Sequence, residues 1–211
     1  MRRPSARRAM PGFIQRTASG HRTTDPRSRL LQERIVILGT PVDETSANDV
    51  TARFMYLEHH APGRDISLYL NSPGGSFHAM SAIYDTLCYV TCDVETVCPG
   101  RAEGTAALLP AAGTPGKRAV LPGSRLLLRL PPAEEPVQGR ADDPAVRAEE
   151  PTRVRSRMEE TLVRHTGRTA ERVRADVERD TVLDARTALD YGPADRIVPA
   201  RRSGYPAPDA K

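Results

Sequence analysis

The chain contains no tryptophan, and aromatic residues account for only 4% of its 211 residues. A core without large aromatic side chains has to be built from Leu, Val, Ile and Ala. No apolar run approaches the roughly 20 residues that a membrane-spanning helix needs, so the sequence predicts no membrane partner. A hydrophobic fraction of 38% with 27% charged residues is typical of a globular domain.

Cysteine is also scarce, since Cys88, Cys92 and Cys98 make up the whole set of three. Their spacing contains no CxxC pair and no nearby histidine completes a ligand set, so we expect no metal and no cofactor. An odd number of cysteines argues against a disulfide framework and fits a reducing compartment. The expected location is the cytoplasm.

Lysine is nearly absent, because Lys117 and Lys211 are the only two and all the other strong bases are arginines. The net charge of +4 comes mainly from residues 1–29, which hold eight Arg and a single acid, Asp25. This segment has no periodicity, and we expect it to be a disordered arm. Because the rest of the chain is close to neutral, the sequence favours no nucleic-acid partner.

Within residues 30–200, β-branched runs alternate with segments of helical periodicity, and a short polar tail follows at 201–211. This alternation predicts βαβ units and a mainly parallel α/β sheet in one domain. The predicted strands are 34–39, 65–72, 93–100 and two short strands within 117–130. The predicted helices are 44–60, 77–90, 106–112, 145–165 and one or two within 171–192.

Five motifs, in order along the chain, carry a resemblance to a known family. They are LYLNSPGGS at 68–76, AIYDTL at 82–87, GKRAVLPGSRLLL at 116–128, RHTG at 164–167 and DVERDTVLDARTALDYGPADRIV at 176–198. From about Glu33 to Val198 the sequence resembles the proteolytic subunit of the ATP-dependent Clp protease, a serine peptidase. The resemblance implies a crotonase-like α/β fold, a βαβ head domain with a protruding helical handle at about 131–166. Because Pro151 interrupts that handle, we expect a kink there or a helix that begins at Pro151.

The same resemblance implies partners and a mechanism. Subunits of this family stack as two heptameric rings, of one paralogue or several, around a hidden chamber. AAA+ Clp ATPases dock on the rings and feed unfolded proteins into the chamber. The family's reaction uses a Ser-His-Asp triad, in which Ser attacks the peptide carbonyl, His takes its proton and Asp orients the His.

Two of the three triad positions carry residues without the required chemistry. In GRAEGTA (100–106), which matches the family's G-x-A-x-S-x-G/A turn, Gly104 occupies the position of the serine. Arg129 occupies the position of the histidine, and only the acid is kept, as Asp180. Glycine offers no nucleophile, and a guanidinium has no lone pair that accepts a proton near neutral pH. The sequence therefore predicts a catalytically inactive or impaired subunit, and we expect Arg129 to pair with Asp180 or Glu103.

The resemblance also assigns backbone donors and an interface. Gly74 and Gly75 correspond to the loop that donates a backbone N–H to the oxyanion, and Thr105 corresponds to the second donor. Glu178 and Arg179 correspond to the acidic–Arg pair through which the family's rings lock together. An exposed charge pair on one helix contributes less than about 1 kcal/mol to stability, so its interest is as an interface.

Three other functions stay open at this point. Thr105, one step along the turn, would serve as the relocated nucleophile of an active serine/threonine-type peptidase if a base lay beside it. A crotonase-like enzyme would use the oxyanion donors on an acyl-CoA substrate. The arginine-rich arm would bind nucleic acid or a membrane, which salt-dependent retention on heparin would reveal.

Overall fold

The structure, a computed structural model, describes residues 13–17, 20–131 and 144–199. Its centre is a five-stranded sheet in the order β10-β7-β5-β4-β3, in which every pairing is parallel. The strands are β3 (Ile35–Leu38), β4 (Ile66–Leu70), β5 (Val94–Cys98), β7 (Arg118–Val120) and β10 (Arg196–Ile197). The α/β class and the parallel sheet predicted from the sequence are therefore confirmed.

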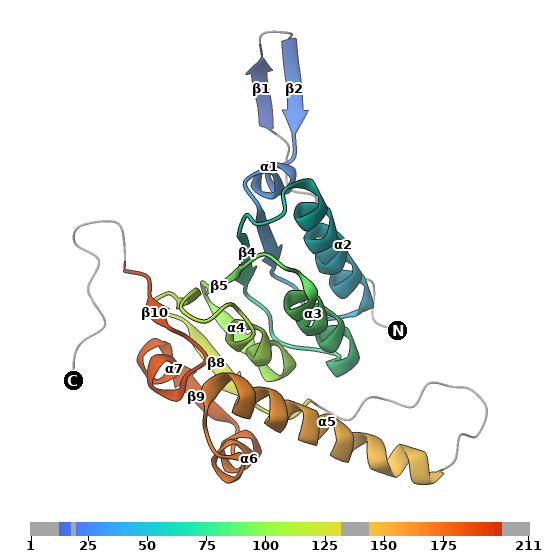
Figure 1. Ribbon diagram of the computed structural model, residues 1–211, viewed down its shortest axis with the longest axis vertical. Coiled ribbons are helices and arrows are strands. Elements are labelled where there is room, and N and C mark those ends of the chain that lie inside the picture. The colour runs from blue at the N-terminus through green and yellow to red at the C-terminus, as the bar shows by residue number, and fades with distance from the viewer. Residues whose placement is uncertain (1–12, 18–19, 132–143, 200–211) are drawn as a thin grey trace.

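Three helices connect successive strands of this sheet. They are α2 (Glu44–His60), α3 (Phe77–Tyr89) and α4 (Leu108–Ala111), the last preceded by the 3₁₀ turn η1 (Gly104–Ala107). Because β3, β4, β5 and β7 follow one another in a single direction, right-handed crossovers place all three helices on the same face. Figure 1 shows α2 and α3 side by side with α4 next to them.

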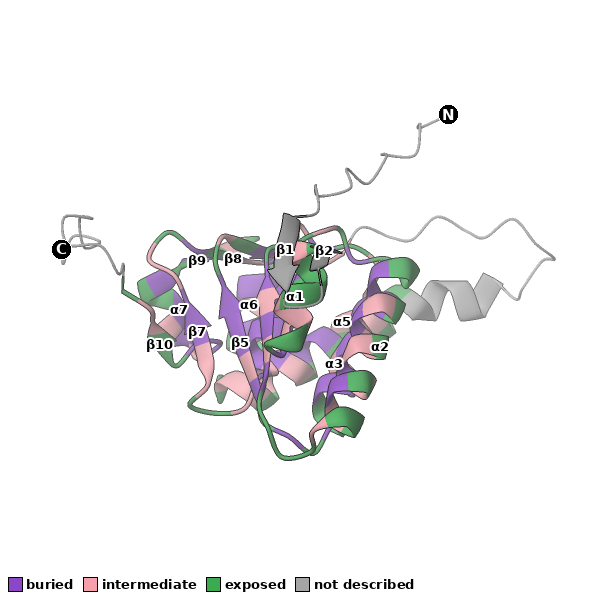
Figure 2. Cartoon of the chain, turned by 90° about the horizontal axis from the view of Figure 1, so that it is seen from above, coloured by how far each residue is buried: buried purple, intermediate pink, exposed green. Residues whose placement is uncertain are grey.

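The core lies between the sheet and these helices. Phe54 and Ile83 project from α2 and α3 and are fully buried, as are Leu68 and Leu70 of β4. Figure 2 shows buried residues along the strands and along the sheet-facing sides of the helices. Burial of such side chains stabilises the fold by about 1.5–3 kcal/mol each. Aliphatic side chains therefore stabilise a core that contains few aromatic residues.

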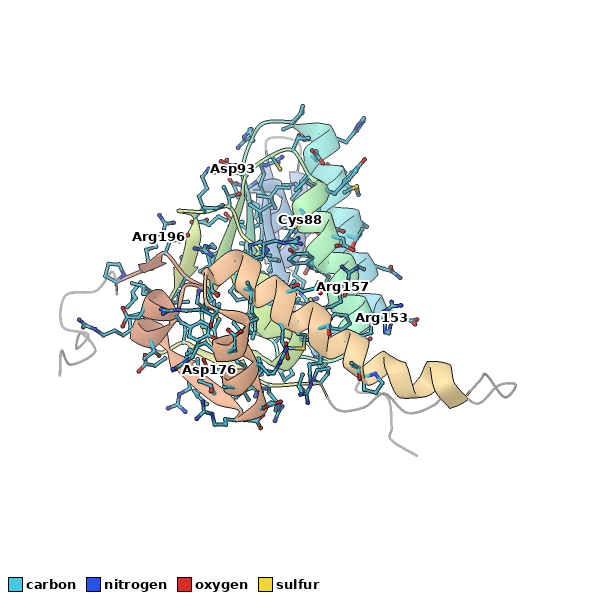
Figure 3. All side chains as sticks on the ribbon, turned by 60° about the horizontal axis from the view of Figure 1, so that its bottom comes forward. Cys88, Asp93, Arg153, Arg157, Asp176 and Arg196 are labelled. Atoms are coloured by element: carbon cyan, nitrogen blue, oxygen red, sulfur yellow. The ribbon has the colours of Figure 1, made fainter. Side chains whose placement is uncertain are left out.

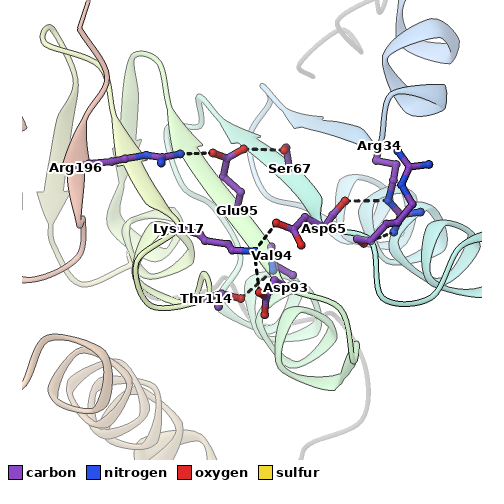
Figure 4. A network of polar contacts seen from close by, with 10 residues as sticks. Arg34, Asp65, Ser67, Asp93, Val94, Glu95, Thr114, Lys117 and Arg196 are labelled. Atoms are coloured by element: carbon purple, nitrogen blue, oxygen red, sulfur yellow. Dashed lines mark hydrogen bonds and ion pairs between the residues drawn. The ribbon is translucent and has the colours of Figure 1, made fainter.

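Charged side chains tie together the ends of the parallel strands. Lys117, just before β7, forms ion pairs with Asp65, before β4, and with Asp93, before β5 (Figure 4). These two carboxylates hold the pKa of Lys117 above its usual value. Across the sheet, Glu95 accepts a hydrogen bond from the Ser67 hydroxyl at 2.8 Å and pairs with Arg196 of β10 at 2.5 Å.

A second, smaller sheet has the strand order β6-β8-β9, and the Gly104 turn follows its strand β6. It comprises β6 (Arg101–Glu103), β8 (Arg125–Leu128) and β9 (Thr181–Asp184), with β6 parallel and β9 antiparallel to β8. Only helices were predicted for 171–192, but β9 separates α6 (Ala170–Glu178) from α7 (Ala185–Tyr191). The chain leaves α6 through Asp180, at φ +53°, and pairs with β8 instead of continuing as a helix.

The prediction of disorder for residues 1–29 is wrong for the part of that segment that the structure describes. β1 (Phe13–Thr17) and β2 (Gly20–Thr24) form an antiparallel hairpin, and α1 (Pro26–Gln32) follows. Residues 13–24 include Ile14 and three threonines, and these β-branched residues favour strands. Asp25 caps α1 by accepting from the Ser28 N–H at 3.1 Å, and Pro26 suits the first turn.

The predicted handle corresponds to α5 (Pro144–Thr166), which contains Pro151 and extends beyond the rest of the fold in Figure 1. The prediction of a helix that begins at Pro151 is wrong, because α5 begins at Pro144. A proline fits the first turn of a helix. The kink at Pro151 stays a prediction. Residues 132–143 of the handle and the tail at 201–211 lie outside the described residues.

Candidate functional site

The chain turns sharply from a strand into a helix at Gly104. β6 ends at Glu103, Gly104 has φ +55°, and η1 and α4 follow directly. A strained strand-to-helix turn of this kind is the geometry of a nucleophile elbow, which holds a reactive side chain clear of the sheet. Among the residues that the structure describes, a Cβ atom placed on Gly104 would have a single neighbour within 4 Å, the carbonyl oxygen of Arg129 at 3.8 Å. Within that part of the chain the elbow therefore has space for a Cβ atom.

The predicted residues Arg129 and Asp180 lie together beside this turn. β8 pairs with β9 up to Leu128 and Thr181, and Arg129 and Asp180 are the residues that directly flank this last pair. The Arg129 carbonyl oxygen lies 3.8 Å from the place of a Cβ on Gly104. The assignment of the three positions to a triad stays a prediction.

The predicted ion pairs of Arg129 are absent. Within the described part of the chain, no hydrogen bond or ion pair joins the side chain of Arg129 to Asp180 or Glu103. Both Arg129 and Asp180 are exposed, where an ion pair contributes about 0–1 kcal/mol and water competes with it. Glu103 instead accepts a hydrogen bond from Arg101 at 3.2 Å.

The loop predicted to stabilise an oxyanion, Pro73 to Ser76, packs directly against the elbow. A Cβ atom on Gly74 would lie 2.4 Å from the carbonyl oxygen of Glu103, and one on Gly75 would lie 2.1 Å from that of Val42. Both glycines have positive φ, +86° and +154°. Neither position accommodates a side chain, so the backbone of the loop is held close to the backbone of the elbow.

Thr105 connects the two turns through its side chain. Its hydroxyl oxygen accepts a hydrogen bond from the Gly75 N–H at 3.1 Å and donates to the Gly75 carbonyl at 3.2 Å. Thr105 is 1% exposed. The Gly74 N–H donates to the Ser72 hydroxyl at 3.2 Å. The N–H groups of both loop glycines therefore have partners inside the protein.

Comparison with known proteins places this geometry in a family. The family model of Clp protease matches residues 18–201. The chain belongs to the Clp protease family. A Streptomyces coelicolor relative, named as ATP-dependent Clp protease proteolytic subunit-like, is 68% identical over 203 residues, with 96% of each chain covered. Two relatives named ATP-dependent Clp protease proteolytic subunit 1 are 50% identical in Corynebacterium diphtheriae (96% of each chain) and 51% in Corynebacterium glutamicum (94% and 95%).

The family assignment and the Clp protease fold predicted from the sequence are thereby confirmed. The comparisons also support a role in proteolysis at the level of the family, as a chain like the Clp proteolytic subunits. Among the residues that the structure describes, no helix is long and apolar enough to cross a membrane.

The two residues assigned to the contact between Clp rings do not pair with each other. Glu178 accepts from Arg155 of α5 at 2.7 Å, and Arg179 donates through Nε to the Ala175 carbonyl at 3.0 Å. Both side chains are largely exposed at the end of α6. Their interface role stays a prediction.

Two buried carboxylates were missed by the sequence reasoning. Asp176 of α6, labelled in Figure 3, pairs with Arg172 at 2.7 Å, and Glu159 of α5 pairs with Arg174 at 3.1 Å. The second pair joins the Clp handle helix to α6. Burial and the nearby Asp176 raise the pKa of Tyr191 to about 12. The i,i+4 spacing of Arg172 and Asp176 on one helix could have predicted their ion pair. Nothing in the sequence links Glu159 to Arg174.

Cys92 and Cys98 are buried in this fold and His165 is partly buried, whereas Cys88 is exposed. His165 Nε2 lies 2.8 Å from the Tyr84 hydroxyl, and burial, with Arg118 and Arg164 nearby, lowers its pKa. Burial raises the pKa of the Cys92 and Cys98 thiols. No cluster of three metal-ligating side chains occurs within the residues that the structure describes.

Proposed function

We propose that this chain is a catalytically inactive subunit of a Clp protease, which assembles into heptameric rings with active proteolytic paralogues. In this role it takes part in the degradation of unfolded proteins that an AAA+ Clp ATPase delivers, in the cytoplasm. The observation that carries the proposal is the elbow at Gly104, where there is space for a nucleophile and none is present.

The chemistry of the site supports the loss of peptidase activity. Acyl transfer needs an oxygen or sulfur nucleophile at the elbow, and Gly104 supplies none. It also needs a base that accepts the nucleophile's proton, and a guanidinium such as that of Arg129 has no lone pair to accept it. The retained acid, Asp180, then has no imidazole to orient.

The alternative nucleophile, Thr105, has little support. Its side chain is buried, and its hydroxyl donates to the Gly75 carbonyl instead of a base. A crotonase-like acyl-CoA enzyme has little support for a related reason, because the N–H groups of Gly74 and Gly75 already have internal partners. No specific observation favours either function.

Mixing experiments test the proposal. The chain is combined with an active Clp proteolytic paralogue, and with the same paralogue lacking its catalytic serine, and the rings are weighed by native mass spectrometry. We expect mixed rings in both cases and peptide hydrolysis only with the intact paralogue. Hydrolysis by rings that contain the serine-deficient paralogue would overturn the claim of inactivity. Absence of mixed rings would overturn the claim of assembly.

A further inference from the structure

The hydroxyl of Thr105 occupies a backbone N–H of the glycine loop next to the elbow. The hydroxyl oxygen accepts from the Gly75 N–H at 3.1 Å and donates to the Gly75 carbonyl at 3.2 Å. A hydroxyl of this kind satisfies both polar groups of one peptide residue at once. It therefore fixes the loop glycine and the residue after the elbow as one unit.

Backbone contacts hold both partners of these hydrogen bonds in place. Thr105 is 1% exposed and lies in η1, whose four residues are all buried, whereas Gly75 is exposed. The loop is held by a parallel bridge between Val42 and Gly75 and by the bond from Val42 N–H to the Gly74 carbonyl at 2.9 Å. A Cβ on Gly75 would lie 2.1 Å from the Val42 carbonyl oxygen, so the two backbones are closely packed.

We infer that Thr105 is an autoinhibitory positioning residue, whose hydroxyl closes the oxyanion hole by occupying the Gly75 N–H. The inference rests on the proposed function and adds a third defect to the loss of a nucleophile and a base. An oxyanion hole works only when its donors point without a partner at the place where negative charge develops. Here the donor is already bonded to a neutral oxygen, so a tetrahedral adduct at the elbow would have to break that bond first.

Restoring the peptidase would then require more than a nucleophile and a base. Replacing Gly104 by serine and Arg129 by histidine would supply the nucleophile and the base, but the hydroxyl of Thr105 would remain in the hole. Removing one oxyanion donor from a serine peptidase slows the reaction by about 10²–10³-fold. The doubly substituted chain should therefore be slow, and loss of the hydroxyl should speed it.

The test uses the full chain with Gly104→Ser and Arg129→His, and compares Thr105→Val with Thr105→Ser in that background. Valine has the shape of threonine without the hydroxyl, whereas serine keeps the hydroxyl. The rate of labelling by a fluorophosphonate, which forms a tetrahedral adduct, is measured together with kcat and KM for a small peptide. We expect the valine variant to react at least about 10-fold faster than the serine variant, with the change in kcat and not in KM.

Equal rates for the two variants, including no reaction of either, would overturn the inference. If the valine variant does not fold, Thr105→Ala replaces it, because alanine also lacks the hydroxyl. Its labelling rate and kcat are then compared with those of the Thr105→Ser variant. The proposed function fails by a different result, reaction of the unsubstituted chain with the fluorophosphonate or absence of mixed rings. Each failure is therefore recognised separately.

Discussion

The site contains two turns built on glycine, and they hold glycine for different reasons. In the loop from Pro73 to Ser76, a Cβ on Gly74 would lie 2.4 Å from a backbone oxygen, so packing forbids any side chain. In the elbow, a Cβ on Gly104 would have one neighbour, at 3.8 Å. The loop glycines are thus required by the structure, whereas the elbow glycine is not required by its surroundings.

This difference shows which glycines the packing of the two turns requires, and under the proposed function it explains how the fold is kept when the catalytic groups are lost. A loop whose backbone packs against Val42 and Glu103 cannot change without damage to the fold. A side chain that projects from the elbow is removed at little structural cost. The expected result is a chain that keeps the shape of a Clp subunit after losing the groups that react.

Gly74→Ala should give the largest effect and tests the packing argument directly. The clash with the Glu103 carbonyl should lower the free energy of unfolding by about 3 kcal/mol. Gly116→Ala is the matched control, because Gly116 has the same φ of +86° and nothing within 4 Å of a Cβ. Its expected loss is about 1 kcal/mol, from backbone strain alone. If urea denaturation gives the same loss of unfolding free energy for both variants, the close packing of Gly74 does not require glycine.

Thr105→Val should give the next largest effect in the otherwise unsubstituted chain. It removes two part-buried hydrogen bonds to Gly75, which lowers the free energy of unfolding by about 2 kcal/mol. Thr105→Ser keeps the hydroxyl and should lose less than half as much. If the two variants unfold at the same urea concentration, the hydroxyl does not link the turns.

Gly104→Ser should be tolerated better than either change. The site has space for the side chain, so the cost is about 1 kcal/mol for a non-glycine residue at φ +55°. Urea denaturation and native mass spectrometry should show a folded chain that still enters mixed rings. A loss as large as that of Gly74→Ala would mean that the elbow, too, requires glycine.

A pH titration should give the smallest effect, away from both turns. Burial, Arg118 and Arg164 lower the pKa of His165 in the folded chain, so the unfolded chain binds the proton more readily. The stability contributed by neutral His165 is therefore full above about pH 6.5 and declines as the pH falls below it. The melting temperature should drop less between pH 7.5 and pH 5.5 for His165→Gln than for the unsubstituted chain. An equal drop would contradict this assignment.

Much of the fold could be predicted from periodicity, because the long buried strands and amphipathic helices carry strong patterns. The strands β6, β9 and β10, of two to four residues each, were missed, whereas the equally short β7 and β8 lie in the apolar run within 117–130 that predicted them. The hairpin of β1 and β2 was missed because an arginine-rich composition resembles a disordered arm. Short strands are held by pairing with a partner far along the chain, which a local pattern does not record.

The contacts within the candidate site could not be predicted from the sequence. Arg129 and Asp180 flank the last printed pair of β8 and β9, yet the expected ion pair between them is absent from the described residues. The bond between Thr105 and Gly75 joins residues 30 positions apart and depends on how closely two loops pack. Sequence spacing identifies which residues meet, whereas hydrogen bonds depend on distances of a few tenths of an ångström.

The most direct test of the central claim is fluorophosphonate labelling of mixed rings, followed by mass spectrometry of the separated subunits. The account predicts one adduct on each active paralogue and none on this chain, because Gly104 has no nucleophile to modify. An adduct on this chain, mapped to Thr105 or to any other residue, would contradict it.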